Sequence, residues 1–221
     1  LEHAGGRLAL APAEVRHLVE QTGFAFLFAP AFHGAMRHAV GVRRDLGVRT
    51  LFNLLGPLSN PAGAGHGLIG VYAARWVRPV AEVLASLGAV HVLVVHAEDG
   101  LDELSVATPS AVVEVRDGEV HEYRIDPVQL GVRPGQLAEA RVSSPAESLA
   151  MLERVLRGRD AGAATELVVL NAGAALYAAD LARDLSAGVG LAREVLASGA
   201  AWERLGSYVE RSKAPAIVAE K

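Results

Sequence analysis

The chain has 221 residues and a mass of 23.1 kDa, and it is 51% hydrophobic and 21% charged, which is the composition of a globular protein that can bury a full core. A net charge of −4 argues against a general nucleic-acid-binding surface, and the lack of cysteine excludes disulfides, thiolate zinc sites and cysteine nucleophiles. We find no apolar run long enough to span a bilayer and no secretory start, so the expected compartment is the cytoplasm.

The first third of the chain predicts helices around one short strand. Pro12 begins a helix that Gly23 ends, and the continuous apolar run at residues 24–29, FAFLFA, is typical of a buried strand. Residues 33–46 are helical by content, although Gly41 interrupts them. A following helix, FNLL, should stop at Gly56-Pro57, because proline fixes its own φ and disfavours helical geometry in the residue before it. Asn60-Pro61 then opens a loop.

The remaining two thirds alternate between strands and helices. Strands are predicted at residues 67–71 and 89–97, the second being the best central strand, with a helix at 75–87 between them. Residues 111–125 predict a hairpin with Asp117-Gly118 as its turn. Helices are predicted from Pro145, at 161–180, at 186–198 and at 201–212. The fold class is therefore α/β, with a mainly parallel central sheet, an antiparallel hairpin and helices on both faces.

The window from Ala31 to Pro61 concentrates a histidine, several arginines and a Gly-Pro turn. The segment FAPAFHGAMRHAVGVRRDLGVRTLFNLLGPLSNPA resembles the anthranilate phosphoribosyltransferase family of tryptophan biosynthesis. The resemblance continues through GLDELS at 100–105 and through the segment 171–201. It implies a nucleoside phosphorylase/phosphoribosyltransferase-like fold, with residues 1–30 and 59–221 in the α/β domain and 31–58 contributing helices to a small helical domain. It also implies a homodimer.

The same resemblance implies an anthranilate pocket. Arg43 would bind the carboxylate, for which a planar guanidinium is well suited, and His33, Met36, Gly56 and Pro57 would line the pocket. Ideal helical periodicity from His33 favours Arg44 instead, whereas the family pattern and a helix break at Gly41 favour Arg43. Ordinary roles, such as a solvated arginine or a structural histidine, stay open for each of these residues.

Asp102 and Glu103 follow the predicted central strand, at the end where open α/β sheets place their ligands. Adjacent carboxylates on a loop are usually only solvated, but they can also hold Mg²⁺. The resemblance implies that this pair binds the Mg²⁺ that neutralises the pyrophosphate of phosphoribosyl pyrophosphate. By contrast, Gly65, Gly67 and Gly70 are no dinucleotide motif, because a strand contains Gly70, and His91 and His96 lack a second ligand pair at zinc spacing.

These observations predict an anthranilate phosphoribosyltransferase that uses anthranilate, phosphoribosyl pyrophosphate and Mg²⁺, with no catalytic acid or base assigned. The chain is expected to be a C-terminal fragment, because the family's N-terminal helices, glycine-rich GTGGD loop and KHGN segment do not occur in it. Two alternatives remain: a nucleic-acid-binding paralogue of the same fold, and a folded but inert fragment.

Overall fold

The computed structural model describes residues 1–32 and 52–213. Its helices and strands follow in the order α1 (Pro12–Thr22), α2 (Ala29–Phe32), α4 (Phe52–Leu58), β1 (His66–Gly70), α5 (Val77–Ser86), β2 (His91–Ala97), β3 (Ser110–Arg116), β4 (Glu119–Ile125), α6 (Pro145–Leu156), α7 (Ala163–Ala178), α8 (Leu185–Ser198) and α9 (Ala200–Ser212). Short 3-10 helices occupy Ala74–Trp76, Pro127–Leu130 and Leu137–Ala140. Within these residues there is no helix with the length and hydrophobicity that a membrane span requires.

The four strands form one sheet in the order β1-β2-β3-β4. Only β1 and β2 are parallel, and β3 and β4 both pair antiparallel, so the prediction of a mainly parallel sheet is wrong for the described residues. The α/β class is confirmed. Parallel pairing needs a crossover such as α5, whereas β2 reaches β3 through a loop without a helix, and the Asp117-Gly118 turn joins β3 to β4. Both turn residues have positive φ, 51° and 83°, as a tight hairpin requires.

Helices cover both faces of the sheet, as the sequence predicts. Alternate residues of β2 point to opposite faces. Val92 and Val94 pack against α5, whereas Leu93 and Val95 belong to the core shared with α7 and α8. The sheet is therefore the middle layer of a three-layer structure. Loops can present polar side chains only where they leave the ends of its strands.

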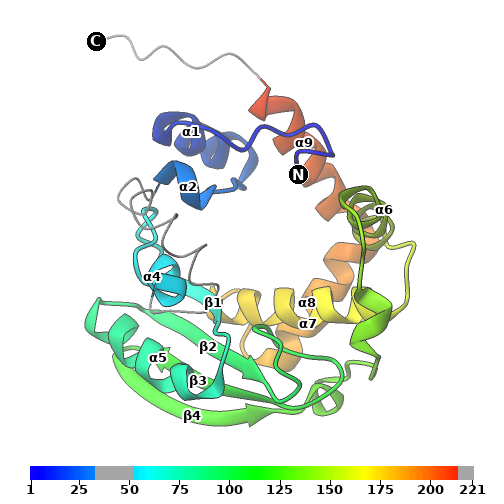
Figure 1. Cartoon of the computed structure of the whole chain (residues 1–221). Coiled ribbons are helices and arrows are strands. Elements are labelled where there is room, and N and C mark those ends of the chain that lie inside the picture. The colour runs from blue at the N-terminus through cyan, green and yellow to red at the C-terminus, as the bar shows by residue number, and fades with distance from the viewer. Residues whose placement is uncertain (33–51, 214–221) are drawn as a thin grey trace.

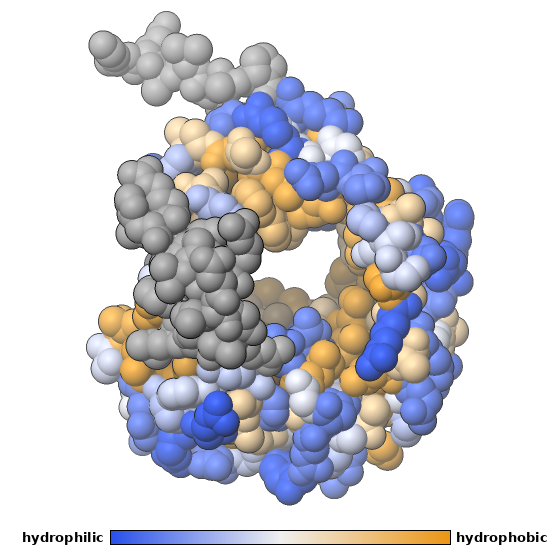
Figure 2. Space-filling model, viewed as in Figure 1, coloured by the Kyte–Doolittle hydropathy of each residue, from blue (hydrophilic) through white to orange (hydrophobic). Residues whose placement is uncertain are grey.

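The helices α1, α2 and α9 lie away from the sheet, on the other side of a central opening (Figure 1). Leu10, Val15, Leu18 and Tyr208 form a separate small core between α1 and α9. The space-filling view shows hydrophobic residues along much of the wall of the opening (Figure 2). The division into domains at residues 30 and 58 stays a prediction.

Two local predictions are wrong. Residues 24–28 are not a strand, because no described strand pairs with them; instead Phe24 packs edge-on against Tyr208, with 5.2 Å between ring centroids. The helix α4 runs through Gly56 and Pro57 rather than stopping there. A proline removes one i→i−4 hydrogen bond, a small loss when the helix ends at the next residue and Leu54 is buried against α5. The loop after it is confirmed, with the Asn60 side chain accepting a hydrogen bond from the Ala62 N–H.

Candidate functional site

The loop at residues 98–109 leaves the carboxyl end of β2 and carries Asp102 and Glu103. It is held by a side chain of α7 and by a hydrogen bond within the loop. Asn171 on α7 accepts a hydrogen bond from the Leu104 N–H at 3.0 Å and donates one to the Leu104 carbonyl at 2.9 Å. The buried Ser105 hydroxyl donates to Asp99 at 2.6 Å. Such anchors fix a loop in one conformation, so the two carboxylates project from a preorganised backbone.

Gly70, the last residue of β1, explains why the loop can cross the strand ends. A Cβ atom at this position would lie 1.6 Å from the Asp102 carbonyl oxygen, so the backbones touch at a distance that only glycine allows. The parallel pairing of β1 with β2 brings the two carboxyl ends together there. Asp102 is therefore seated over the ends of the two parallel strands, which is where open α/β sheets bind their ligands.

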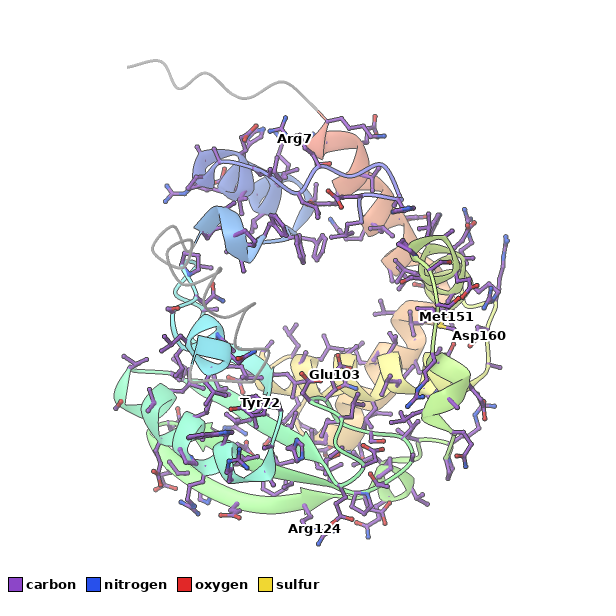
Figure 3. All side chains as sticks on the ribbon, in the orientation of Figure 1. Arg7, Tyr72, Glu103, Arg124, Met151 and Asp160 are labelled. Carbon is purple, nitrogen blue, oxygen red and sulfur yellow. The ribbon has the colours of Figure 1, made fainter. Side chains whose placement is uncertain are left out.

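Asp102 and Glu103 carry two negative charges with no compensation in the described part of the chain. Neither carboxylate makes an ion pair or a hydrogen bond to a residue in the ranges 1–32 and 52–213. Desolvation and then the charge of Asp102 raise the pKa of Glu103. Figure 3 shows Glu103 at the border of the central opening. A cation bound at this point would oppose that shift, because a nearby positive charge favours the ionised carboxylate.

The donor set of this pair fits Mg²⁺. Adjacent carboxylates offer hard oxygen ligands, and Mg²⁺ commonly takes one or two of them and keeps several waters or substrate oxygens. Among the described residues no third histidine, aspartate or glutamate joins the pair at ligand distance. Asp102 and Glu103 would therefore hold the ion from one side only and leave its remaining positions to water or phosphate.

The predicted anthranilate-binding residues are only partly visible. His33, Met36 and Arg43, together with the alternative Arg44, lie outside the described residues. Gly56 and Pro57 belong to the last turn of α4, which packs against α5 (Figure 1). The structure thus places Gly56, Pro57 and the Mg²⁺ candidates, and the choice between Arg43 and Arg44 stays a prediction.

Sequence reasoning missed Gly70 and Asn171 as parts of this site. Gly70 stood in a formal G-x-G-x-x-G pattern that we reject as a dinucleotide motif, and its place in β1 confirms the rejection. Its real constraint is a contact with a loop 32 residues later in the chain, which no local pattern reveals. Asn171 did offer a signal, as an isolated polar residue in an apolar helix, because such groups need a hydrogen-bonding partner.

Comparison with known proteins identifies the relatives of this arrangement. Residues 1–202 match the model of the glycosyl transferase family, a/b domain. An anthranilate phosphoribosyltransferase of Acidithiobacillus ferrooxidans is 52% identical over 212 residues, covering 96% of this chain and 62% of the relative. The chain therefore spans less than two thirds of the length of that relative.

Solved structures agree with the sequence comparison. An anthranilate phosphoribosyltransferase from Thermus thermophilus superposes with a TM-score of 0.90 at 46% identity, covering 96% of this chain and 63% of that one. The enzyme from Saccharomyces cerevisiae, solved in complex with PRPP and Mg, gives a TM-score of 0.86 at 25% identity, covering 94% of this chain and 60% of that one.

Proposed function

Because the chain belongs to the glycosyl transferase family through its a/b domain, we propose that it is the larger part of an anthranilate phosphoribosyltransferase. The reaction transfers the phosphoribosyl group of phosphoribosyl pyrophosphate to the amine of anthranilate, in tryptophan biosynthesis. One observation carries the proposal: a rigid loop places Asp102 and Glu103, without partners among the described residues, at the carboxyl ends of the parallel strands, in a chain 52% identical to such an enzyme. A homodimer, a cytoplasmic location and a small helical domain that includes residues 31–58 belong to the same proposal.

Each candidate residue has a role in this reaction. Arg43 pairs with the anthranilate carboxylate, and His33, Met36, Gly56 and Pro57 line the pocket that holds the ring. Asp102 and Glu103 hold Mg²⁺, which when bound neutralises charge on the pyrophosphate. In the reaction the amine nitrogen forms a bond to C1 of the ribose, the bond from C1 to the pyrophosphate oxygen breaks, and the amine loses a proton. Because an aromatic amine is weakly basic and neutral at pH 7, positioning of the reactants is the main task of the protein.

The test of this function is an activity assay on two proteins. In the first, the 221-residue chain is used alone; in the second, it is joined to the part of the Acidithiobacillus ferrooxidans relative that it does not cover, which we propose to lie on its N-terminal side. Both are incubated with anthranilate, phosphoribosyl pyrophosphate and Mg²⁺, and the loss of anthranilate fluorescence is followed. We expect turnover from the joined protein and none from the chain alone. A folded joined protein without turnover would refute the proposed function.

A double variant, Asp102→Asn with Glu103→Gln, tests the Mg²⁺ role within the joined protein. We expect it to need more Mg²⁺ for half-maximal turnover while the KM for anthranilate stays nearly the same, because the ion serves the pyrophosphate. The control is Asp117→Asn with Glu119→Gln, a pair of exposed carboxylates at the β3–β4 turn. An unchanged Mg²⁺ dependence in the first double variant would show that Asp102 and Glu103 are ordinary surface charges and do not bind the ion.

The alternative of a nucleic-acid-binding paralogue is separated by a DNA-binding assay at several salt concentrations. Binding through phosphate contacts weakens steeply as salt rises. Salt-dependent DNA binding by the joined protein without turnover would favour that alternative.

A further inference from the structure

A second polar cluster lies at the other end of the sheet, where β1 and β2 begin. His66 and His91 are the first residues of the two strands and are paired in register, so their side chains point to the same face. The register partner of His91 on β3 is Arg116. Asp180, just beyond the end of α7, lies over this row, and its backbone has a positive φ of 56°. This left-handed residue belongs to the C-terminal motif of α7, in which the Leu181 N–H bonds to the Leu176 carbonyl, and it fixes the position of the Asp180 side chain.

From this geometry we propose that His66, His91 and Asp180 form a binding site for a divalent transition-metal ion such as Zn²⁺. One ligand atom from each residue lies within 4.8 Å of the others. His91 Nδ1 is 2.9 Å from one Asp180 carboxylate oxygen, and His66 Nδ1 is 3.8 Å from the other. His66 Nδ1 also donates a hydrogen bond to the Ala178 carbonyl at 2.8 Å, so an ion would take Nε2 of this ring or replace that hydrogen bond. In a tetrahedral zinc site with bonds of about 2.0–2.2 Å, neighbouring ligand atoms stand roughly 3.3 Å apart. To reach that geometry the His66 ring must turn or leave the Ala178 carbonyl, and the Asp180 carboxylate must shift; both side chains are partly exposed.

The surroundings of His91 resemble the support that metal-binding histidines receive. The ring is buried, and its Nε2 lies 2.9 Å from a carboxylate oxygen of Glu114. Glu114 in turn accepts hydrogen bonds from the hydroxyls of Tyr123 and Tyr177, each at 2.8 Å. A carboxylate on one ring nitrogen fixes the orientation and tautomer of the imidazole, and its partners keep the carboxylate in place.

This support creates a requirement at the other ring nitrogen. If Nε2 donates its hydrogen to Glu114, then in a neutral imidazole Nδ1 carries a lone pair that faces the Asp180 carboxylate at 2.9 Å. Two acceptors at that distance repel unless a positive species lies between them. That species is either a second proton on the ring or a metal ion. Both ring nitrogens thus face carboxylate oxygens, an arrangement that a metal ion at Nδ1 would satisfy as well as a proton does.

Arg116 limits the affinity of the site. Its guanidinium lies 3.3 Å from the same Asp180 oxygen that faces His91, and it is within hydrogen-bonding distance of the Tyr177 hydroxyl. A divalent ion would be repelled by this charge, and the half-exposed arginine would have to swing away. We therefore expect binding in the micromolar range, and tighter binding when the charge of Arg116 is removed. This inference is independent of the proposed function, because the cluster lies at the opposite end of the strands from Asp102 and Glu103.

Two imidazoles and one carboxylate suit Zn²⁺ and neighbouring transition metals better than Mg²⁺. The partial exposure of His66 and Asp180 gives the ion a path of entry and leaves a position for water. The sequence did not predict this site, because His91 has no second ligand near it in the chain. The partners come from β1, 25 residues earlier, and from the end of α7, 89 residues later.

The experiment is calorimetric titration of the metal-free 221-residue chain, prepared without a histidine tag, with Zn²⁺, followed by titration with Co²⁺. We expect one Zn²⁺ per chain and the intense visible absorption of four-coordinate Co²⁺. His66→Ala and Asp180→Asn, at partly exposed positions, should each weaken Zn²⁺ binding at least about tenfold. Removing a residue that only supports a metal ligand already weakens binding by that factor. Arg116→Gln should tighten it.

The matched control is His96→Ala, on the same strand as His91 but bonded to the Val71 carbonyl instead, and it should leave the affinity unchanged. Circular dichroism on every variant checks that the fold is kept. The proposal is overturned if the chain binds no stoichiometric Zn²⁺, or if well-folded His66→Ala and Asp180→Asn bind it as tightly as the original chain. Weakening by His96→Ala alone would also overturn it, since binding would then lie elsewhere.

Discussion

Replacing Gly70 by alanine should dislodge the loop that carries Asp102 and Glu103. The added methyl group would begin 1.6 Å from the Asp102 carbonyl oxygen, whereas real Cβ atoms essentially never come closer than 3.0 Å to another heavy atom. The carbonyl must therefore retreat by at least 3.0 − 1.6 = 1.4 Å. It cannot do so freely, because the Asn171 side chain accepts one hydrogen bond from Leu104, two residues later, and donates another to it.

The cost of this change follows from two opposing effects. Overpacking of a fixed backbone costs about 1–3 kcal/mol, whereas alanine in place of glycine in a strand regains roughly 0.5–1 kcal/mol of backbone entropy. We expect a net loss of up to about 2.5 kcal/mol, equivalent to a fall in melting temperature of up to roughly 10 °C for a domain of this size. In the joined protein the displaced carboxylates should also raise the Mg²⁺ concentration needed for turnover.

Thermal unfolding of Gly70→Ala beside Gly67→Ala measures the effect. Gly67 belongs to the same strand, but a Cβ there would meet no atom within 4 Å, so its substitution should be neutral or slightly stabilising. Equal melting temperatures for the two variants would show that the loop yields without cost. The description of Asp102 and Glu103 as rigidly placed would then be wrong.

Three further predictions concern other parts of the chain. Arg133 and Arg193 both bind the buried carboxylate of Glu166, and the hydrogen bonds from Arg193 are the largest cause that lowers its pKa from 4.5 to about 2. In acid unfolding, the stability that this ionised carboxylate contributes should be fully present above pH 4.5 and be lost as the pH falls toward 2, and Glu166→Gln should remove that dependence. Gly188→Ala should destabilise the protein by about 1–3 kcal/mol in urea unfolding, because its Cβ would lie 2.2 Å from the Gly173 carbonyl oxygen. Gly190 in the same helix has open space around it, so Gly190→Ala should stabilise by up to about 1 kcal/mol. Equal effects of the two substitutions would contradict the close crossing of α7 and α8. In the joined protein, Arg43→Ala should raise the KM for anthranilate far more than Arg44→Ala. The expected loss of anthranilate binding energy is roughly 2–5 kcal/mol if the charge pair is buried. The reverse order would show that simple helical periodicity from His33 was the better guide.

Much of the fold could be predicted from the sequence because its signals are local. Pro12 and Gly23 bound α1, Asp117-Gly118 turns the hairpin, and Pro145 begins α6, each through a backbone constraint that the residue itself imposes. The apolar run of β2 needed no partner to be recognised as a buried strand. Family resemblance then pointed to Asp102 and Glu103.

Tertiary structure decided what local signals leave open. The run at residues 24–28 has the hydrophobicity of a strand, but it covers the α1–α9 core instead, because hydrophobicity reports burial and not the choice of partner. Strand direction depends on the connection between strands, so β3 turned out antiparallel to β2. The contact of Gly70 with Asp102, and the meeting of His66, His91 and Asp180, join residues far apart in the chain. Such contacts exist only once the sheet and α7 have folded together, since spacing along a chain fixes neighbours within one helix or strand and not between them.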